Sequence, residues 1–342
     1  MKKVKVSFYV ILITFFIFFF IELCFKYYFK ETKKLSCYTN VNDKKIYVNE
    51  SNCYFKEKYF EKQKITTYVT NSYGERVSEN NRNLYKDKLI FVGDSFTFGY
   101  LSNYEDTYPY NFISQINKKR NKKKFSEINL GVNGYQIDQV LQILKTNKKI
   151  GEKNNFVFYG LAPNDLFDIQ DGRSKDTKIQ KSNLLNKVRS IINNLNLLSV
   201  KFISRSLLKN DEVYINLYYK RGIDSGYINM NSSPSWDYKY KYFENNINLL
   251  DESLKKRLIV LIIPQQIQIK LLKKGYRNDA LAFDTRIKEI CNKIDLYCLS
   301  LTEEIGKKFE YKTHFLLDGH LLPKVNKYYG TLAADKIHNL LK

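Results

Sequence analysis

Cysteine, histidine and proline are scarce in this chain of 342 residues, which contains five Cys, three His and five Pro. No two cysteines form a C-x-x-C pair, and their spacing does not suit a zinc site. The lysine clusters, such as residues 118–124, come with no nucleic-acid-binding motif and are typical of a solvated loop. The sequence therefore does not indicate a zinc-binding protein, and we expect no nucleic acid among its partners.

Acidic residues are also in the minority, because 35 Asp and Glu stand against 57 Lys and Arg, for a formal net charge of +22. Such a charge would favour an anionic partner, such as an acidic glycan or an anionic lipid. The excess of Lys accompanies abundant Asn, Ile, Tyr and Phe, which is the composition that an A/T-rich genome produces. The charge alone leaves both interpretations open, and a polyanion-binding surface protein stays one of the alternatives.

Apolar and aromatic residues, in contrast, are plentiful, at 44% and 15% of the chain. This composition predicts a packed globular core rather than a disordered chain. The length suits a membrane anchor followed by one large domain or two small ones.

The cysteines leave two interpretations open. Cys24 lies at the end of the N-terminal apolar segment, and the other four are close enough in sequence for two local pairs. These pairs would be Cys37 with Cys53 and Cys291 with Cys298. Disulfides of this kind would suit an oxidising compartment, whereas buried free thiols are the alternative.

One long apolar run lies at the N-terminus, at residues 6–23 (VSFYVILITFFIFFFIEL), and Glu22 is its only charged residue. A run of about 18 apolar residues is long enough to cross a bilayer. No second run is comparable, so the sequence predicts a single transmembrane helix within residues 1–25. Lysines flank the run on both sides, so the charge pattern does not indicate its orientation.

A cleaved signal peptide is the alternative for this segment. Its apolar core is usually shorter, and small residues follow it at the cleavage site. Here bulky Phe, Tyr and Lys follow, and Leu23 is too large for the position before a lipidated Cys24. The sequence therefore favours an uncleaved membrane anchor, with the remaining chain on the extracytoplasmic side, in the periplasm or on the outer face.

A regular alternation of strands and helices begins near residue 86 and continues to residue 342, whereas residues 26–85 are interpreted as a stalk and lead-in with short strands. Apolar runs predict strands at 89–92, 126–130, 156–159, 257–263 and 297–301. Helical periodicity predicts helices at 107–119, 137–144, 240–255, 279–294 and from Pro323 onward. This alternation predicts an α/β fold, a doubly wound parallel sheet flanked by helices.

Residues 168–237 interrupt this rhythm. They contain an amphipathic segment at 184–208 and a polar patch at 229–234. We interpret the stretch as an insertion that covers the functional site as a lid or cap. In doubly wound sheets such sites form beyond the carboxyl ends of the strands, which directs attention to the loops there.

The first predicted strand ends in Gly93-Asp94-Ser95, at a turn from strand to helix. A Ser at such a turn is exposed at the edge of the sheet, where its backbone N–H can face a developing oxyanion. Gly-Asp-Ser is also an ordinary turn in which the Ser caps the helix. Taken alone, the motif leaves a nucleophile and a helix cap as equal alternatives.

Three further segments place small or polar residues at the same predicted edge. They are residues 129–134 (NLGVNG), 160–165 (GLAPND) and 318–320 (DGH). His320 is one of three histidines in the chain, with His314 and His338. A His two residues after an Asp, in a loop at this edge, favours a catalytic role over a structural one.

Together the four segments resemble the SGNH/GDSL hydrolase family over roughly residues 71–342, apart from the insertion. The resemblance implies a flavodoxin-like three-layer sandwich. It implies that Ser95 is the nucleophile, that His320 is the general base and that Asp318 orients His320. The segment at 71–76 (NSYGER) is also similar to the lead-in of bacterial members.

The same resemblance implies an oxyanion hole formed by the backbone N–H groups of Ser95 and Gly134 and by the side-chain amide of Asn164. Asp94 and the Asp165 that follows Asn164 are interpreted as structural carboxylates that hold the turns. The G-x-S-x-G elbow of α/β-hydrolases is absent.

Two positions depart from the family pattern. Ala162 stands where the third block usually has Gly. The last block is usually D-x-x-H, but here Asp318 and His320 form D-x-H, which is similar to membrane-associated members that handle polysaccharide acyl groups. A backbone carbonyl is therefore the alternative partner for the His320 ring.

These residue types predict ester chemistry in which His320 takes the proton of Ser95 and an acyl-enzyme forms. No metal and no organic cofactor is required. We expect an esterase that acts on O-acyl (acetyl) esters of cell-envelope glycan or lipid. An O-acyltransferase that modifies surface polysaccharide and a non-catalytic glycan-binding envelope protein are the alternatives.

Overall fold

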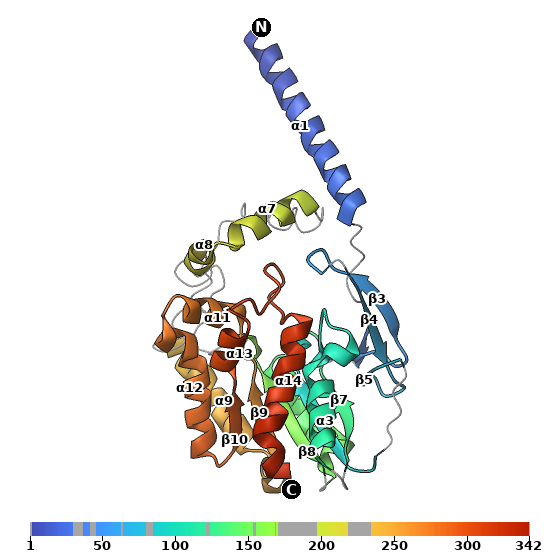
Figure 1. The fold of residues 1–342 in the computed structure, drawn as a ribbon, viewed down its shortest axis with the longest axis vertical. Coiled ribbons are helices and arrows are strands. Elements are labelled where there is room, and N and C mark those ends of the chain that lie inside the picture. The colour runs from blue at the N-terminus through green and yellow to red at the C-terminus, as the bar shows by residue number, and fades with distance from the viewer. Residues whose placement is uncertain are drawn as a thin grey trace.

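The computed structural model describes residues 2–29, 37–41, 46–62, 64–79, 85–120, 124–152, 155–167, 169, 197–217 and 234–341 (Figure 1). A five-stranded sheet in the order β10-β9-β8-β6-β7 forms its centre, and all of its pairings are parallel. The strands are β6 (Lys88–Gly93), β7 (Ser126–Asn129), β8 (Phe156–Leu161), β9 (Leu258–Ile262) and β10 (Tyr297–Ser300). The predicted doubly wound parallel sheet is confirmed.

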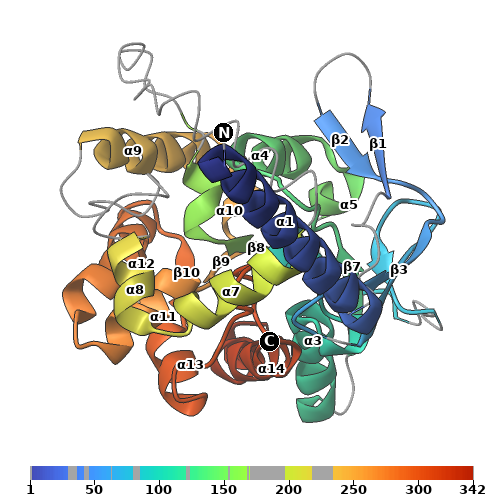
Figure 2. The same ribbon diagram turned by 90° about the horizontal axis from the view of Figure 1, so that it is seen from above.

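Both faces of this sheet are covered, which explains why the inner strands β6, β8 and β9 are almost entirely apolar. Side chains alternate along β6, so Ile90 and Val92 join one core and Leu89 and Phe91 join the other. The first core lies under α4 (Ile137–Thr146), α9 (Pro234–Asn248) and α12 (Arg277–Lys293). The second lies under α3 (Tyr108–Lys119), α13 (Thr302–Lys308) and α14 (Pro323–Ile337). Figure 2 shows α4 and α9 on one side and α3 and α14 on the other, which makes three layers.

The prediction of one helix at 240–255 is wrong, because two helices occupy this range. The helical pattern is interrupted between α9 and α10 (Glu252–Lys255), because the Asp251 carboxylate accepts hydrogen bonds from the backbone N–H groups of Ser253 and Leu254. Such a side chain starts a new helix rather than continuing the old one. The helices that were not predicted include α11 (Gln266–Lys273) and α13, which are short and begin within a few residues of a strand end. A short α5 (Lys148–Gly151) also follows α4.

The predicted lead-in contains short strands that pack on the parallel sheet's domain. β1 (Tyr38–Val41) and β2 (Ile46–Asn49) form a hairpin, and β3 (Tyr54–Lys58), β4 (Ile65–Thr70) and β5 (Arg76–Val77) form an antiparallel sheet. The buried Arg76 guanidinium lies 4.6 Å from the rings of both Tyr68 and Phe98, and it donates to the Ser102 carbonyl at 3.0 Å. The segment similar to the family's lead-in therefore supports the turn that follows Ser95.

The predicted insertion at 168–237 is described in part, as α7 (Leu198–Leu208), α8 (Asp211–Ile215) and the first residues of α9. Residues 184–196 of the amphipathic segment and residues 229–233 of the polar patch lie outside the described residues. α7 and α8 lie above the end of the domain that carries α11 and α13 (Figure 1). Tyr214 and Ile215 of α8 pack with Ile267 and Leu271 of α11.

The N-terminal segment forms α1 (Lys2–Phe29), which extends away from the sheet (Figure 1). Its Glu22 is 5% exposed and accepts hydrogen bonds from the backbone N–H groups of Leu198 and Ser199, which begin α7. Within the side chains that the structure describes, no helix has a stretch long and apolar enough to cross a membrane. Four residues of the predicted span have side chains outside the described residues: Val6, Ser7, Phe8 and Ile11.

Two disulfides settle the alternatives that the cysteines left open. Cys37 is bonded to Cys53 and Cys291 to Cys298, with Cα atoms 5.9 and 6.1 Å apart. These distances are usual for disulfides. The first joins the segment before β1 to the segment before β3, and the second joins α12 to β10. Cys24 is an exposed free thiol.

Candidate active site

Ser95 lies at the carboxyl end of β6, where the chain turns sharply into the short helix α2 (Ser95–Phe98). Gly93 has φ +153°, and a Cβ there would lie 2.2 Å from the Thr97 hydroxyl and 2.8 Å from the Gly160 carbonyl oxygen. Only Gly fits such a turn. The cap of α2 is Asp94, whose carboxylate accepts a hydrogen bond from the Phe96 backbone N–H at 2.9 Å. The alternative in which Ser95 is the helix cap is therefore wrong.

The hydroxyl of Ser95 contacts His320 across 225 residues of sequence. Its Oγ lies 2.6 Å from His320 Nε2, and His320 Nδ1 is hydrogen-bonded to Asp318 Oδ1. The Asp318 carboxylate also accepts a hydrogen bond from the His320 backbone N–H at 3.3 Å. The structure thus brings the three predicted residues into one hydrogen-bonded chain, and the ring's partner is the carboxylate rather than a backbone carbonyl.

The short D-x-H spacing is accommodated by a closed turn. The backbone N–H of Phe315 donates to the His320 carbonyl, and that of Gly319 donates to the Phe315 carbonyl, both at 2.9 Å. Gly319 has φ +88°, a conformation that favours Gly. The turn bends Asp318 back toward the ring of His320.

Two aromatic rings hold the imidazole of His320. The ring centroid of Phe96 lies 4.8 Å from it and that of Tyr100 lies 5.0 Å from it. Tyr100 is itself fixed, because its hydroxyl donates to the buried Glu57 carboxylate at 3.0 Å. The side chain of His320 is only 17% exposed, so its neighbours control its charge.

Burial lowers the pKa of His320, but the Asp318 carboxylate, with Asp94 and Glu57 further away, raises it more. The net result is a pKa above the ordinary value of 6.5. A raised pKa makes the imidazole a stronger base toward Ser95 once it is neutral.

Asn164 lies at the end of β8, in the 3-10 helix η2 (Pro163–Leu166), and its amide is oriented at both ends. Its Nδ2 donates to Asp94 Oδ2 at 2.8 Å, and its Oδ1 accepts from Gln265 Nε2. An amide nitrogen carries two hydrogens, so a second N–H is available to a ligand. Asn164 lines the same cavity as Ser95 and His320.

Gly134, the other predicted donor, is not among the described residues that line this cavity. It has φ +76°, and a Cβ there would lie 2.6 Å from the Tyr47 hydroxyl. Its loop does pack behind Ser95, because a Cβ on Gly131 would lie 2.2 Å from the Phe98 nitrogen of α2. The role of Gly134 as an oxyanion donor stays a prediction.

The carboxylates interpreted as structural are both fully buried. Asp165 accepts hydrogen bonds from the Tyr159 hydroxyl at 3.1 Å and from the Ala162 backbone N–H at 3.3 Å. Burial, followed by the nearby Asp94 carboxylate, raises the pKa of Asp165 well above its ordinary value. Its contacts hold the turn that carries Asn164, as Asp94 holds the turn that carries Ser95.

The other buried histidine has a different environment. His314 Nε2 contacts the Pro264 carbonyl at 2.9 Å and its Nδ1 contacts the Thr313 hydroxyl at 2.6 Å. Burial lowers the pKa of His314 to about 3, so it stays neutral. Both ring nitrogens are engaged by structural partners, which distinguishes His314 from His320.

A cavity of about 370 Å³ opens beside Ser95. Its walls combine aromatic rings (Phe96, Phe167 and Tyr214) with the side-chain amides of Gln265 and Gln266. These two Gln residues were not predicted as site residues, although they follow the carboxyl end of β9, where sites form in doubly wound sheets.

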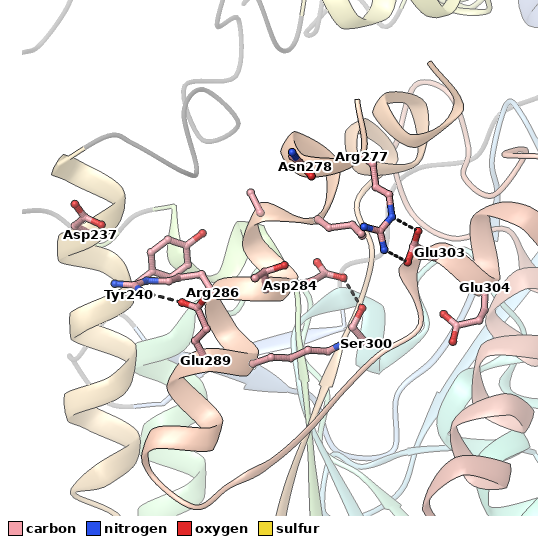
Figure 3. A pocket seen from close by; sticks show the side chains of 14 residues that line it. Asp237, Tyr240, Arg277, Asn278, Asp284, Arg286, Glu289, Ser300, Glu303 and Glu304 are labelled. Carbon is pink, nitrogen blue, oxygen red and sulfur yellow. Dashed lines mark hydrogen bonds and ion pairs between the residues drawn. The ribbon is translucent and has the colours of Figure 1, made fainter. Parts of the chain in front are cut away.

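A larger cavity of about 720 Å³ lies between α9, α12 and α13 (Figure 3). Its lining contains no histidine or cysteine among the described residues. The buried Asp284 there accepts hydrogen bonds from Ser300, Thr302 and Gln268. Arg277 pairs with Glu303 in the same wall. A nucleophile beside a base occurs in the smaller cavity, which we therefore take as the candidate active site.

Within the described residues there is no group of three or more His, Cys, Asp or Glu side chains that could hold a metal ion.

No protein-family model and no curated protein matches the chain. Similar solved structures include a member of the lipolytic G-D-S-L family from Veillonella parvula, a lipase/acylhydrolase from Enterococcus faecalis and an acetyl xylan esterase. Their identities to the chain are 12%, 13% and 13%, and their TM-scores are 0.40, 0.41 and 0.40. They cover 73%, 75% and 74% of this chain and 97%, 97% and 98% of their own. The first of these is named for the family that the four segments resemble.

Replacing Asn164 with Ala should lower kcat for an ester substrate by about a hundred- to a thousandfold, with little change in KM, because the predicted oxyanion donor would be lost. Steady-state kinetics on a chromogenic acetyl ester would measure this. Asn155→Ala is the matched control. Asn155 is more buried than Asn164 and is also hydrogen-bonded through its side-chain amide, but it lies at the amino end of β8, away from Ser95. Equal losses in the two variants would contradict the role of Asn164.

Proposed function

We propose that the protein is a carboxylic ester hydrolase in which Ser95 is the nucleophile, His320 the general base and Asp318 the orienting carboxylate. The observation that carries this proposal is the hydrogen-bonded chain from Ser95 Oγ to His320 Nε2, at 2.6 Å, and from His320 Nδ1 to Asp318. A serine hydroxyl is a weak nucleophile unless such a base takes its proton.

In the first half-reaction Ser95 Oγ attacks the ester carbonyl carbon while its proton moves to His320 Nε2. Asp318 stabilises the imidazolium that forms. The tetrahedral intermediate collapses, the C–O bond to the alcohol breaks, and the imidazolium protonates the leaving alcohol. An acyl group is then bonded to Ser95.

In the second half-reaction His320 takes a proton from water, which attacks the acyl carbon. The bond from that carbon to Ser95 Oγ then breaks, His320 returns the proton to Oγ, and the acid is released. In both half-reactions the negative charge develops on the former carbonyl oxygen. We propose the second N–H of the Asn164 amide, with the backbone N–H groups of Ser95 and Gly134, as its donors.

For the substrate we propose an O-acyl ester, acetyl in the first instance, of cell-envelope glycan or lipid. The cavity of about 370 Å³ supports a short acyl group with part of a sugar ring. Its aromatic walls, such as Phe167 and Tyr214, suit the apolar face of a sugar, and the amides of Gln265 and Gln266 suit its hydroxyl groups. A sugar hydroxyl in place of the second-step water would make the protein an O-acyltransferase.

Detergent-solubilised full-length protein would be assayed on a chromogenic acetyl ester, with and without a glycan acceptor. We expect acetate release without the acceptor; faster release together with an acetylated acceptor would indicate the transferase. A fluorophosphonate probe should label the peptide of residues 94–100. A protein that binds glycan but neither turns over ester nor takes up the probe would be the non-catalytic alternative.

We also propose that α1 anchors the protein in a membrane and that the active site is extracytoplasmic. Large apolar side chains along α1 support this, since Phe15, Phe16 and Phe20 are each at least 60% exposed. The two disulfides support an oxidising compartment. After carbonate extraction of cells the protein should stay with the membranes, and deletion of residues 1–29 should release it. Release of the full chain by carbonate would contradict the anchor.

A further inference from the structure

We propose that Glu61, from the lead-in between β3 and β4, is a positioning residue that holds the loop carrying Asp318 and His320 in its reactive arrangement. This inference rests on the proposed function of Ser95 and His320. Glu61 belongs to none of the motifs discussed above, and more than 250 residues of sequence separate it from the loop that it contacts.

The contact is made with the backbone of the loop. Glu61 Oε1 accepts a hydrogen bond from the Leu316 N–H at 3.2 Å, and Glu61 Oε2 accepts one from the Leu317 N–H at 2.9 Å. These two amides directly precede Asp318. A carboxylate that accepts two backbone N–H groups makes charge-assisted hydrogen bonds, which are stronger than neutral ones.

A neighbouring ring strengthens the same contact. Tyr59 packs edge-on against Phe315, with ring centroids 5.8 Å apart, and its hydroxyl donates to Glu61 Oε2 at 3.3 Å. Phe315 and His320 close the turn through their own backbone hydrogen bond. The lead-in thus contacts three consecutive residues at the start of the turn whose end carries the proposed base.

The charge of Glu61 is balanced from a third part of the chain. The side chain of Glu61 is only 3% exposed, and Arg205 Nε of α7 lies 3.1 Å from Oε1. Burial raises the pKa of Glu61 above its ordinary value, and the Leu317 N–H, Arg205 and the Leu316 N–H offset this rise only in part. The buried carboxylate of Glu61 therefore connects three parts of the chain. They are the lead-in to which Glu61 belongs, the loop that carries Asp318 and His320 (the catalytic loop), and helix α7 of the predicted insertion.

The consequence for the reaction is geometric. Only two residues, Asp318 and Gly319, lie between Leu317 and His320, so a shift of the Leu316 and Leu317 amides is transmitted to the His320 ring. A displacement of about 1 Å in a reacting group can cost about a hundredfold in rate. Loosening the loop would also weaken the contact between His320 and Asp318, which is the contact that raises the pKa of His320.

The test compares Glu61→Ala and Glu61→Gln with Glu75→Gln in the full-length protein. Glu75 is a matched control, because it is equally buried in the lead-in, accepts a hydrogen bond from Asn71 at 2.7 Å and pairs with Lys149, but does not contact the catalytic loop. For each variant one would measure the second-order rate of fluorophosphonate labelling at Ser95 against pH, and the Tm.

We expect Glu61→Ala to label about a hundredfold more slowly, with the pH midpoint of labelling shifted downward. Glu61→Gln keeps one oxygen acceptor and should fall between Glu61→Ala and wild type, so it carries the test if Glu61→Ala does not fold. Glu75→Gln should lose Tm but keep the wild-type rate and midpoint.

Wild-type rate and midpoint in both Glu61 variants would overturn the role of Glu61 alone. A loss of rate that follows Tm equally in the Glu61 and Glu75 variants, with no shift in midpoint, would also overturn it, because it would show a merely structural residue. Absence of labelling in the wild-type protein would overturn the proposed function and the role of Glu61 with it.

Discussion

Replacing Ser95 with Ala should lower ester hydrolysis by about 10⁴- to 10⁶-fold, because without Oγ no acyl-enzyme can form and only the remaining site can assist direct attack by water. Fluorophosphonate labelling should vanish. The substitution removes one oxygen atom from a residue that is 9% exposed, and the cap of α2 belongs to Asp94, so the Tm should change little.

Two comparisons make this prediction specific. Ser126→Ala is the matched control, because Ser126 is also buried and hydrogen-bonded. It begins β7 and so lies at the amino ends of the strands, whereas Ser95 lies at their carboxyl ends. The double variant Ser95→Ala/His320→Ala should be no slower than the slower single variant, since residues that act as one unit lose their effect together. Undiminished turnover in Ser95→Ala would overturn the proposed mechanism.

Replacing Asp318 with Asn should lower kcat/KM by about 10⁴-fold at neutral pH, because an amide no longer fixes the tautomer of His320 or stabilises its imidazolium. The structure makes this the decisive test of the short D-x-H motif, since His320 Nδ1 contacts the Asp318 carboxylate. A loss below about tenfold would favour the backbone carbonyl that the sequence left as an alternative.

The pH dependence of the same variant has a defined sign. The base must be neutral, so in the wild type kcat/KM should fall as pH decreases through the His320 pKa, which lies above 6.5. Asn at position 318 removes the neighbouring charge that raises this pKa but leaves the burial that lowers it. The midpoint of the pH profile should therefore move to lower pH. Asp251→Asn, which retains a helix cap far from the site, should leave rate and midpoint unchanged.

The central sheet and the proposed catalytic residues could be predicted from the sequence, because short residue patterns and motifs indicate them. A strand buried on both faces must be apolar throughout, and β9 (LIVLI) is an example. A tight turn that exposes a Ser needs a particular Gly, which is why Gly93 and Ser95 appear as a motif. Helix boundaries were harder to predict. The Asp251 carboxylate, for example, ends a continuous helical pattern because it accepts hydrogen bonds from the Ser253 and Leu254 N–H groups and starts a new helix.

The contacts between distant segments were not accessible in this way. Nothing near Glu61 in the sequence distinguishes it from a Glu that is exposed on the surface. Its proposed role depends on the Leu316 and Leu317 amides, which lie more than 250 residues later in the chain. The same holds for Gln265, whose amide orients Asn164. The sequence alone determined the strands and most of the helices around the central sheet, because a buried strand and an amphipathic helix each need a residue pattern over a short stretch. Its resemblance to a known hydrolase family indicated the side chains that we propose for ester chemistry. Only the tertiary structure decided between the Asp318 carboxylate and a backbone carbonyl as the partner of His320, because the choice depends on how the turn from Phe315 to His320 closes. Only the tertiary structure placed Glu61 of the lead-in against their loop, because that contact joins segments far apart in the chain.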